Sequence, residues 1–257
     1  MSKQTMDKEA IHQAVTAAYG AVAKTVGTHV APTGCCTPKL EMPSDYKPEE
    51  LASVPKGAYL AEGSGAPVRS ASLKPGEKVV DLGSGAGMDS FLAANAVGST
   101  GRVWGFDLTP EMLERARRNA ADGGYANVSF DHADIEHLPL AAASADAAIS
   151  NCVINLAPDK AAVYREIFRV LKPGGRLAVA DIVMRGSAEA VEAFRRSAGA
   201  GAWCACVAGA LEQEEYFQAI RSAGFADVCI AAERPAMSQP DGELSAVAIT
   251  VTARKPA

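Results

Sequence analysis

The chain has 257 residues, enough for one full α/β domain with a modest addition or for two small domains. Hydrophobic residues make up 48% and charged residues 21% of it, which supports a sizeable core and argues against extensive disorder. The net charge of −5 argues against nucleic-acid binding through a basic face. The charged N-terminus lacks the apolar stretch of a secretory signal, and no apolar run could span a membrane, so we expect a cytoplasmic protein.

The first part of the chain is expected to hold one helix followed by irregular structure. Residues 7–26 place their apolar side chains on one face at helical spacing. From residue 30 to residue 67 the composition shifts to Pro, Gly, Ser and Thr. This shift predicts irregular chain with short helices, such as one over 48–53.

From Pro75 onward, strand-like apolar runs alternate with helix-like stretches. We expect strands over 78–82, 101–107, 128–132, 145–150, 177–182, 228–232 and 244–253, and helices over 88–96, 111–122, 160–171 and most of 189–222. This alternation predicts an α/β fold with a doubly wound, mostly parallel sheet and helices on both faces. In such a sheet the ligand lies at the carboxyl ends of the strands, near the switch point.

A glycine-rich loop, 83–87, follows the first strand of this region and reads Gly-Ser-Gly-Ala-Gly. Glycines there let the backbone approach a ligand and present amides at the start of the next helix. The third glycine comes two residues after the second, not three as in the dinucleotide fingerprint. Asp81 precedes the loop, and no pyrophosphate needs to be cradled. The loop therefore suits the amino-acid end of S-adenosylmethionine, with Asp81 meeting its ammonium through water.

Acidic residues also follow the next two strands. Asp107 ends the second strand about twenty residues after the loop, where a carboxylate can accept both ribose hydroxyls. Asp134 and Glu136 follow the third strand, where an acid can take the amino group of adenine. Each acid by itself is also typical of a loop or a helix cap. The ordered set after successive strands predicts a site for S-adenosylmethionine.

The cysteines bear on the methyl acceptor. Six are present without paired C-x-x-C knuckles, which argues against a structural zinc site, and no metal is expected. Methyl transfer from a sulfonium needs an acceptor lone pair opposite the leaving sulfur, and an oxygen or nitrogen acceptor calls for a base in the cleft. No histidine follows the fourth strand, whereas Cys152 does. Thiolates select soft centres, and thiolate-bound trivalent arsenic keeps a lone pair and needs no base.

Several longer motifs resemble those of the arsenite S-adenosylmethionine methyltransferases. The specific ones are Ser-Asn-Cys-Val-Ile-Asn-Leu at 150–156 and Cys-Val-Ala-Gly-Ala at 206–210, whereas the glycine loop and the Lys-Pro-Gly-Gly turn are shared more widely. The resemblance runs from about residue 35 to about residue 230. It implies a class I, Rossmann-like methyltransferase with a seven-stranded sheet, an antiparallel C-terminal hairpin and a small helical substrate-binding insertion. The implied division is an N-terminal helix and cap over 1–70, a cofactor core over 71–185, and an arsenic-binding helical segment with terminal strands over 186–257.

The resemblance also implies the site residues. It makes Cys152 and Cys206 the arsenic ligands and gives the vicinal pair Cys35 and Cys36 a part in thiol exchange, with Cys36 as a third catalytic cysteine. The cofactor residues that we expect are Asp81, Gly83, Ser84, Gly85, Gly87, Asp107, Leu108, Met112, Asp134, Ile135, Glu136 and Asn151. The substrate would be a small trivalent arsenical and the co-substrate a thiol reductant such as glutathione or a thioredoxin-type protein. We expect a monomer without nucleic-acid or membrane partners.

One position departs from the family pattern. The family commonly has Gly-Cys-Gly before the first strand, where this chain has Ser64 between two glycines. The missing thiolate would favour a monomethylated or otherwise organic arsenical, unless Cys204 or Cys36 fills its place.

Two other classes of function stay open. One is a methyltransferase for another small molecule, acting on oxygen, carbon or selenium, and the other is a non-catalytic arsenic-binding protein. We expect Cys229, in an apolar strand, to be a buried core residue, and Tyr59 to pack rather than to line the site.

Overall fold

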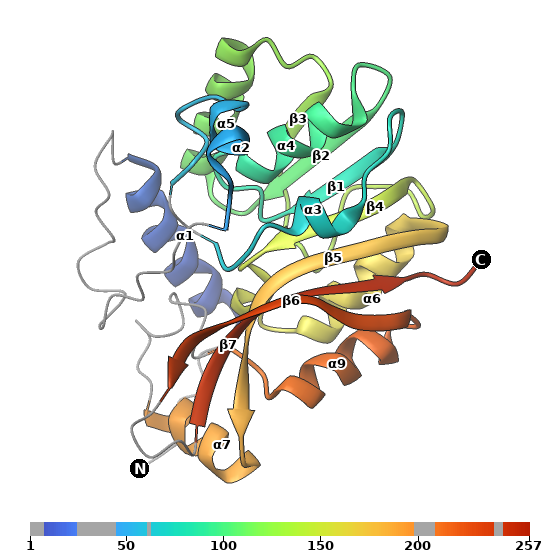
Figure 1. The fold of residues 1–257 in the computed structure, drawn as a ribbon. Helices are drawn as coiled ribbons and strands as arrows, with labels where there is room; N and C mark the ends of the chain where they lie inside the picture. The colour runs from blue at the N-terminus through green and yellow to red at the C-terminus, as the bar shows by residue number, and fades with distance from the viewer. Residues whose placement is uncertain (1–7, 25–44, 61–62, 198–208, 239–243) are drawn as a thin grey trace.

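The computed structural model of the chain describes residues 8–24, 45–60, 63–197, 209–238 and 244–257 (Figure 1). The helices are α1 (Lys8–Lys24), α2 (Pro48–Ala52), α3 (Pro67–Ala71), α4 (Met88–Val97), α5 (Pro110–Gly123), the 3₁₀ helix η1 (Ile154–Leu156), α6 (Lys160–Val170), α7 (Ala188–Ser197) and α9 (Gln213–Ser222). The strands are β1 (Lys78–Leu82), β2 (Arg102–Asp107), β3 (Val128–His132), β4 (Ala145–Asn151), β5 (Leu171–Gly186), β6 (Ala226–Ser238) and β7 (Leu244–Arg254). Every predicted strand is present, and β1 and β3 begin and end at the predicted residues.

All seven strands form one sheet in the order β3-β2-β1-β4-β5-β7-β6. Strands β1 to β5 pair in parallel, whereas β7 lies between β5 and β6 and is antiparallel to both. The predicted doubly wound sheet with an antiparallel C-terminal hairpin is thereby confirmed. The chain moves outward from β1 to β3 and returns on the other side at β4, so the switch point lies between β1 and β4.

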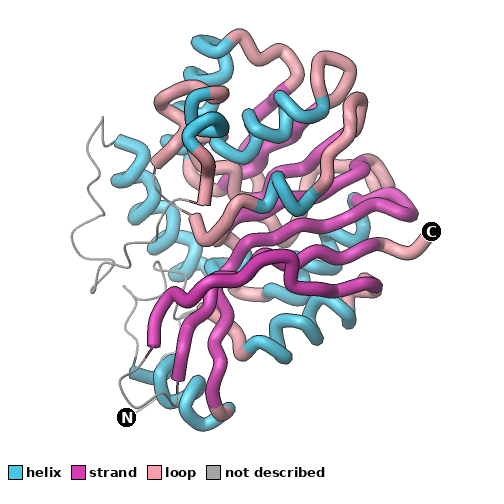
Figure 2. The backbone as a smooth tube through the Cα atoms, in the orientation of Figure 1, coloured by secondary structure: helices cyan, strands magenta, loops and turns pink. Residues whose placement is uncertain are grey.

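Helices cover both faces of the sheet, as the tube in Figure 2 shows. On one face, Phe91 of α4 and Leu113 of α5 belong to a core that includes Val79. On the other, Tyr164 of α6 and the side chains of α9 belong to a core that includes Val80. Val79 and Val80 are both fully buried yet face opposite cores, as the two-residue repeat of a strand requires. Both faces of the central strands are therefore apolar.

Local sequence explains where several helices begin and end. Gly98 and Gly124 follow α4 and α5 with positive φ of +66° and +68°, and Gly124 has the left-handed conformation that glycine adopts at helix ends. Asp159 precedes α6, and its carboxylate accepts a hydrogen bond from the Ala162 amide over 2.8 Å. The two glycines thus end helices on the side of the sheet where β2 and β3 begin, whereas Asp159 starts α6 on the side where β4 ends.

Helix α1 crosses the carboxyl ends of the parallel strands, at the left of Figure 1. Its Ile11 and Val15 pack in a cluster with Ile182 of β5. Arg115 of α5 donates a hydrogen bond to the Ala23 carbonyl over 3.0 Å and so holds the last turn of α1. The N-terminal helix is therefore part of the wall around the switch point.

The C-terminal strands are longer than predicted. Strand β5 continues to Gly186 because it pairs with β7 from Arg176↔Arg254 to Gly186↔Leu244. Strand β6 likewise extends on both sides of its apolar run by pairing with β7. Helix α3 and the 3₁₀ helix η1 had not been predicted. Pairing with a partner strand, which local apolar runs do not report, sets these lengths.

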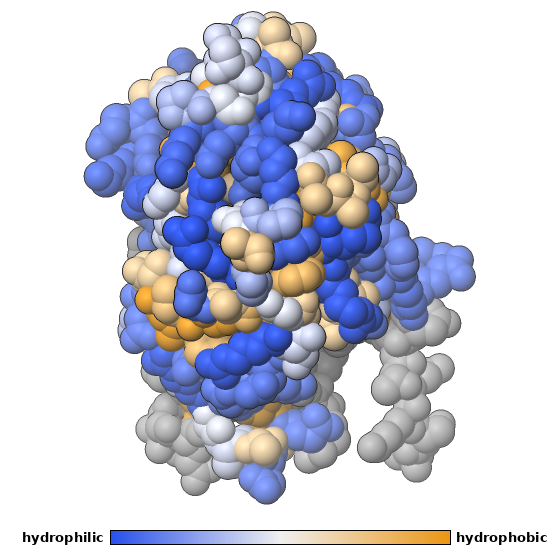
Figure 3. All heavy atoms as spheres, turned by 90° about the vertical axis from the view of Figure 1, so that its right-hand side faces the viewer, coloured by the Kyte–Doolittle hydropathy of each residue, from blue (hydrophilic) through white to orange (hydrophobic). Residues whose placement is uncertain are grey.

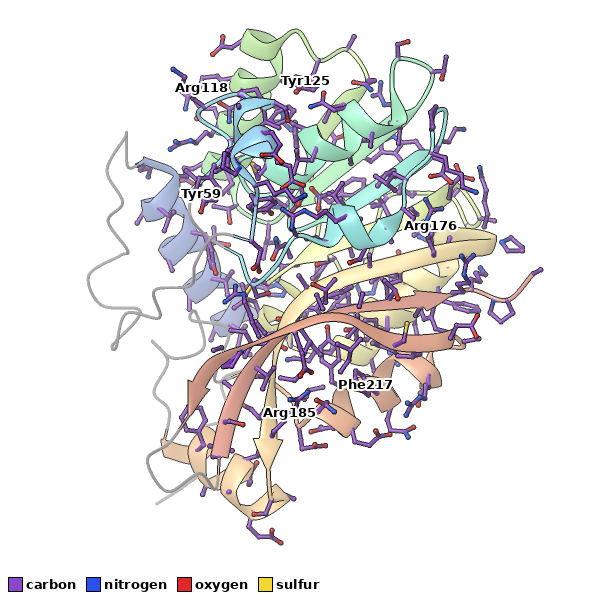
Figure 4. The ribbon with its side chains drawn as sticks, in the orientation of Figure 1. Tyr59, Arg118, Tyr125, Arg176, Arg185 and Phe217 are labelled. Atoms are coloured by element: carbon purple, nitrogen blue, oxygen red, sulfur yellow. The ribbon has the colours of Figure 1, made fainter. Side chains whose placement is uncertain are left out.

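Cys229 is exposed, so the expectation that it is a buried core residue is wrong. Strand β6 is the edge of the sheet, and its register shifts between Ala226 and Cys229, which leaves this side chain on the uncovered side. The Cys229 sulfur lies 3.1 Å from the Thr252 hydroxyl. Tyr59 packs as expected, with its ring 6.0 Å from that of Tyr46 in an edge-on arrangement (Figure 4).

The face on the right of Figure 1 lies on the opposite side of the molecule from α1. This face is mostly hydrophilic, with hydrophobic residues gathered in one band (Figure 3). Arg176, labelled there in Figure 4, donates hydrogen bonds of 2.9 and 2.6 Å to the carboxylate of Glu77. No helix in the described ranges is both long enough and apolar enough to cross a membrane.

Candidate functional site

The glycine loop between β1 and α4 adopts a backbone that only glycine allows. Gly83 has φ of +69°, and a Cβ on it would lie 2.5 Å from the side chain of Val153. Gly87 has φ of +100°, and a Cβ there would lie 2.5 Å from the ring of Phe91. Gly85 also has positive φ, but nothing lies within 4 Å of its Cβ position. The loop thus presents bare, open backbone at the carboxyl end of β1.

Asp107 is fixed by the loop. Its carboxylate accepts hydrogen bonds from the Gly85 amide over 2.9 Å and from the Thr109 amide over 2.8 Å. Burial raises the pKa of Asp107, and these two amide hydrogen bonds partly oppose that rise. The hydroxyl of Ser84 is buried and has no hydrogen-bond partner among the described residues. Leu108 beside Asp107 is half-buried, so the edge of this strand remains accessible.

A buried polar network lies on the other side of the loop. Tyr46 donates a hydrogen bond from its hydroxyl to Asp89 Oδ2 over 2.7 Å, and Asn151 Nδ2 donates to the same oxygen over 3.0 Å. Asp81 Oδ2 accepts a hydrogen bond from the Ser90 hydroxyl over 2.6 Å. The network joins β1, α4, β4 and the segment before α2.

Burial perturbs both acids of this network. Burial, the nearby charge of Asp89 and that of Asp107 raise the pKa of Asp81 to about 8, against the hydrogen bonds from Ser90. Burial raises the pKa of Asp89 to about 6, against the hydrogen bonds from Asn151 and Tyr46. Two such carboxylates side by side favour a proton or a bound cation.

Sequence reasoning missed Tyr46 and Asp89. Asp89 lies in the first turn of α4, where an acidic residue is ordinary because it opposes the helix dipole. Tyr46 lies in the segment that the composition marks as irregular. Tyr46 and Asp89 meet only through tertiary contacts. These are their direct hydrogen bond and the hydrogen bond of 2.9 Å that the Asn151 amide donates to the Tyr46 hydroxyl.

The acids after β3 meet α1. Lys8 lies 2.6 Å from Glu136 and 3.3 Å from Asp134, and His12 lies 3.9 Å from Asp134. The other Glu136 oxygen accepts a hydrogen bond from the Asp159 amide over 3.0 Å, so both its oxygens are engaged. Asp134 is more exposed than Glu136, and its Oδ1 accepts a hydrogen bond from the Glu136 amide over 3.0 Å.

Two apolar members of the predicted cofactor set also occupy defined places. Met112 of α5 is buried and packs with Ala86 of the loop and with Val22 and Ala23 of α1. Ile135 is buried in the core beneath β1 and β4. The glycine loop, Asp107, Met112 and Asp134 therefore border one region, which α1 covers.

Cys152 follows β4 and has an unusual backbone. Its φ is +59°, a left-handed conformation that a residue with a side chain rarely adopts. Its amide donates a hydrogen bond to the Ala180 carbonyl over 2.8 Å, which holds it against β5. The side chain is half-buried in the cluster that includes Ile11 of α1 and Ala210. Backbone strain of this kind persists only where the surrounding structure enforces it.

Ser64 lies beside Asn151, the residue that precedes Cys152. Its amide donates a hydrogen bond to Asn151 Oδ1 over 2.9 Å. The residue is only 2% exposed, and its hydroxyl has no hydrogen-bond partner among the described residues. The position at which a cysteine was expected is thus close to Asn151 and buried at the site.

The other predicted cysteines, Cys35, Cys36, Cys204 and Cys206, lie outside the described residues. The motif that contains Cys206 ends inside them, at Gly209 and Ala210. A Cβ on Gly209 would lie 2.0 Å from the Asn155 carbonyl oxygen, so this glycine packs directly on the chain that follows Cys152. The two specific motifs therefore meet in space.

A further buried acid, Asp181, lies within β5. Asp181 is fully buried, and burial raises its pKa to about 7, against the Ile182 amide and the nearby charge of Lys160. The rings of Tyr164 and Tyr216, both fully buried, lie 5.8 Å apart on the same side of the sheet. Neither Asp181 nor these tyrosines had been singled out in the sequence, because each lies in an apolar run that reads as core.

Comparisons with known proteins bear on this arrangement. A family model described as a methyltransferase domain matches residues 73–224. An arsenite methyltransferase of Halobacterium salinarum is 41% identical over 235 residues, which are 87% of this chain and 59% of that protein. An arsenite methyltransferase of Aquipseudomonas alcaligenes is 36% identical over 88% of this chain and 65% of its own length. The chain thus spans less than two thirds of the length of these curated relatives.

A solved structure is also similar. An arsenic(III) S-adenosylmethionine methyltransferase from Chlamydomonas reinhardtii superposes with a TM-score of 0.65 at 33% identity, over 83% of this chain and 71% of that one. The YcgJ protein of Bacillus, at 18% identity and a TM-score of 0.58, shares the fold alone.

Proposed function

The chain belongs to the arsenite methyltransferases, a family within the class I methyltransferases, and on that premise we propose that it transfers a methyl group from S-adenosylmethionine to trivalent arsenic bound by cysteine sulfur. The observation that carries the proposal is Cys152, half-buried and strained at the carboxyl end of β4, beside the glycine loop. A thiolate there faces the crevice in which a doubly wound sheet binds its ligands.

The residues around the loop fit the proposed cofactor. Gly85 leaves open space beside its backbone, whereas Gly83 and Gly87 allow the tight turn against Val153 and Phe91. The buried hydroxyl of Ser84 lacks a partner among the described residues. We assign the ribose hydroxyls to Asp107 and the adenine amino group to Asp134. Ser84, Leu108, Met112, Ile135, Glu136 and Asn151 complete the proposed wall, with Asp81 near the amino-acid end.

The proposed methyl transfer needs no general acid or base from the chain. Each thiol that captures an arsenic–oxygen group forms an S–As bond while the As–O bond breaks, and the thiol proton leaves with the oxygen as water. S-adenosylmethionine, when bound, supplies a methyl group on a sulfonium. Cys152 would hold the arsenic with its lone pair available to this methyl group, and the apolar cluster of α1, Leu156 and Cys152 would exclude water. No general base is required.

The ligand set beyond Cys152 rests on Cys206 and on Cys36. Support for Cys206 comes from Gly209 and Ala210, which follow it in sequence and pack beside Asn155 and Cys152. We further propose a thiol reductant as co-substrate, a monomer, and the division into a cap over 1–70, a core over 71–185 and a helical and terminal part over 186–257.

The test is Cys152→Ser with Cys229→Ser as the matched control. Arsenite and methylarsenite are incubated with the protein, S-adenosylmethionine and glutathione, and the arsenic products are separated and identified. Cys152→Ser should lose more than about 100-fold in methylation rate, equivalent to about 3 kcal/mol. Cys229→Ser should match the wild type, because its side chain is on the exposed edge. Methylation that survives in Cys152→Ser would favour another acceptor, and arsenic binding without methylation by the wild type would favour a binding protein.

A second candidate is preference for an organic arsenical, and Ser64 favours it. A buried hydroxyl replaces a thiol beside Asn151, so a site with fewer sulfurs is left for arsenic that already carries a carbon. Ser64→Cys should raise the rate ratio for arsenite over methylarsenite. An unchanged ratio, together with loss of arsenic stoichiometry in Cys204→Ser or Cys36→Ser, would show that one of these cysteines supplies the third sulfur.

A further inference from the structure

One carboxylate oxygen of Asp89 has no hydrogen-bond partner in the described part of the buried network. Its Oδ2 accepts both hydrogen bonds, from Tyr46 and from Asn151. Its Oδ1 is buried and has no donor among the described residues. Leaving a buried acceptor unpaired costs about 1–3 kcal/mol, more when it is charged. The site is therefore short of a hydrogen-bond donor at this atom.

The charge around Asp89 is also one-sided. Asp81 of β1 belongs to this network, and Asp107 of β2 adds to the charge at Asp81. Glu50 of α2 also bears on Asp89, but its carboxylate is paired with Arg69 of α3. The groups from the remaining elements, Tyr46 and Asn151, are neutral. Within the described ranges, no Lys or Arg forms an ion pair with Asp81, Asp89 or Asp107. Charges buried in this way need either a proton or a cation.

The place of the missing donor is set by the loop. Asp89 lies two residues after Gly87, in the first turn of α4, which directly follows the glycine loop. The sequence assigns the cofactor ammonium to Asp81, but Asp81 Oδ2 is already engaged by the Ser90 hydroxyl. Asp89 Oδ1 is the buried oxygen of this pair that has no hydrogen-bond donor among the described residues.

We propose that Asp89 is the direct acceptor of the α-ammonium group of S-adenosylmethionine, through Oδ1, and that Asp89 releases a proton to solvent as the cofactor binds. The inference rests on the proposed function and names the residue that selects the amino-acid end of the cofactor. One N–H of the ammonium satisfies Oδ1, and its positive charge offsets the negative charge of the Asp89 carboxylate. Tyr46 and Asn151 are positioning residues that hold the carboxylate.

The pH dependence follows with a defined sign. The pKa of Asp89 is raised to about 6, and that of Asp81 to about 8, so Asp81 stays protonated between pH 5 and pH 7. Over that interval only Asp89 of this pair changes charge, and binding requires its ionised form. Affinity should therefore be about 10-fold weaker at pH 5 than at pH 7.

The experiment uses two probes and two variants. S-adenosylhomocysteine carries the ammonium, whereas 5′-methylthioadenosine lacks the amino-acid end but keeps the adenosine. Binding of both to the wild type, to Asp89→Asn and to Asp131→Asn is measured by titration calorimetry at pH 5, 6 and 7. Asp131 is an exposed acid on β3 and serves as the matched control. At pH 6 the wild type is titrated in buffers of different ionisation enthalpy, which counts the protons released.

The expected result is a loss of about 10-fold or more for S-adenosylhomocysteine in Asp89→Asn at pH 7, with 5′-methylthioadenosine unchanged. The wild type should release about half a proton per S-adenosylhomocysteine at pH 6, and Asp89→Asn should lose the pH dependence. If Asp89→Asn does not fold, Tyr46→Phe replaces it and should move the midpoint of the pH dependence upward, because a hydrogen bond to the carboxylate is lost.

Three outcomes overturn the inference alone. Equal loss of affinity for both probes in Asp89→Asn would assign Asp89 a structural role. The other two are unchanged affinity for S-adenosylhomocysteine in a folded Asp89→Asn and an unshifted pH midpoint of binding in Tyr46→Phe. A wild type that binds neither S-adenosylhomocysteine nor S-adenosylmethionine overturns the proposed function itself and the inference with it.

Discussion

The two ends of the candidate site are built in different ways. The cofactor end comes from β1, the glycine loop and the end of β2, which are near one another in sequence and in space. The thiol end combines Cys152 with chain around Gly209 and with Ile11 of α1. Contiguous motifs carry the first end, whereas tertiary packing assembles the second. Substitutions should therefore act mainly on backbone geometry and charge at the cofactor end, and on packing and strain at the thiol end.

The largest effect is expected for Gly83→Ala at the cofactor end. A Cβ there would lie 2.5 Å from Val153 in a backbone with φ of +69°, so we expect a loss of about 3 kcal/mol in stability or more, together with loss of S-adenosylhomocysteine binding. Gly124→Ala is the matched control, because its φ of +68° is similar but nothing lies within 4 Å. It should cost about 1 kcal/mol and leave binding intact. Urea denaturation and calorimetry measure both, and equal costs would show that contact with Val153 matters little.

The next effect concerns the buried acid near the thiol end. Asp181 has a pKa raised from 3.8 to about 7, so the folded chain holds this proton more tightly than the unfolded chain. The free energy of unfolding should therefore fall as the pH rises from about 4 to about 7, on the order of 3 kcal/mol from this group. Asp181→Asn should remove that part of the fall. Urea denaturation at pH 5 and pH 8 compares the two proteins, and parallel pH profiles would contradict the expectation.

A smaller effect tests the strain at Cys152. Its φ of +59° suits glycine better than alanine, so Cys152→Gly should be more stable than Cys152→Ala by about 1 kcal/mol. Both variants should be inactive in arsenic methylation. Chemical denaturation measures the difference. A more stable alanine variant would mean that the left-handed backbone is not retained without the thiol.

The smallest effect is expected where α1 meets the acids after β3. The Lys8 side chain is 46% exposed, so its pairing with Glu136 should be worth less than about 1 kcal/mol in stability. Lys8→Ala should weaken S-adenosylhomocysteine binding no more than about 3-fold, and less at high salt. Lys24→Ala, which removes an exposed pairing with Glu111, is the control. A loss of 100-fold in Lys8→Ala would show that α1 takes part in holding the cofactor.

Much of the cofactor end could be predicted from the sequence. The loop glycines, Asp107 and the order of strands and helices follow from short-range patterns, because strand and helix periods and turn residues are local properties. Asp89 could not be predicted as part of the same network. An acid in the first turn of a helix is usual, and only the contact with Tyr46, far away in sequence, gives it another meaning.

At the thiol end, too, some features follow from the sequence and others only from the tertiary structure. The sequence by itself determined the fold class and the two cysteine motifs, because those depend on residue type and spacing. Tertiary structure alone decided that Cys152 is strained, that Ser64 is buried against Asn151, and that Cys229 is exposed. Burial depends on which strand ends at the edge and which segments pack over the others, and neither is written in a local run of residues.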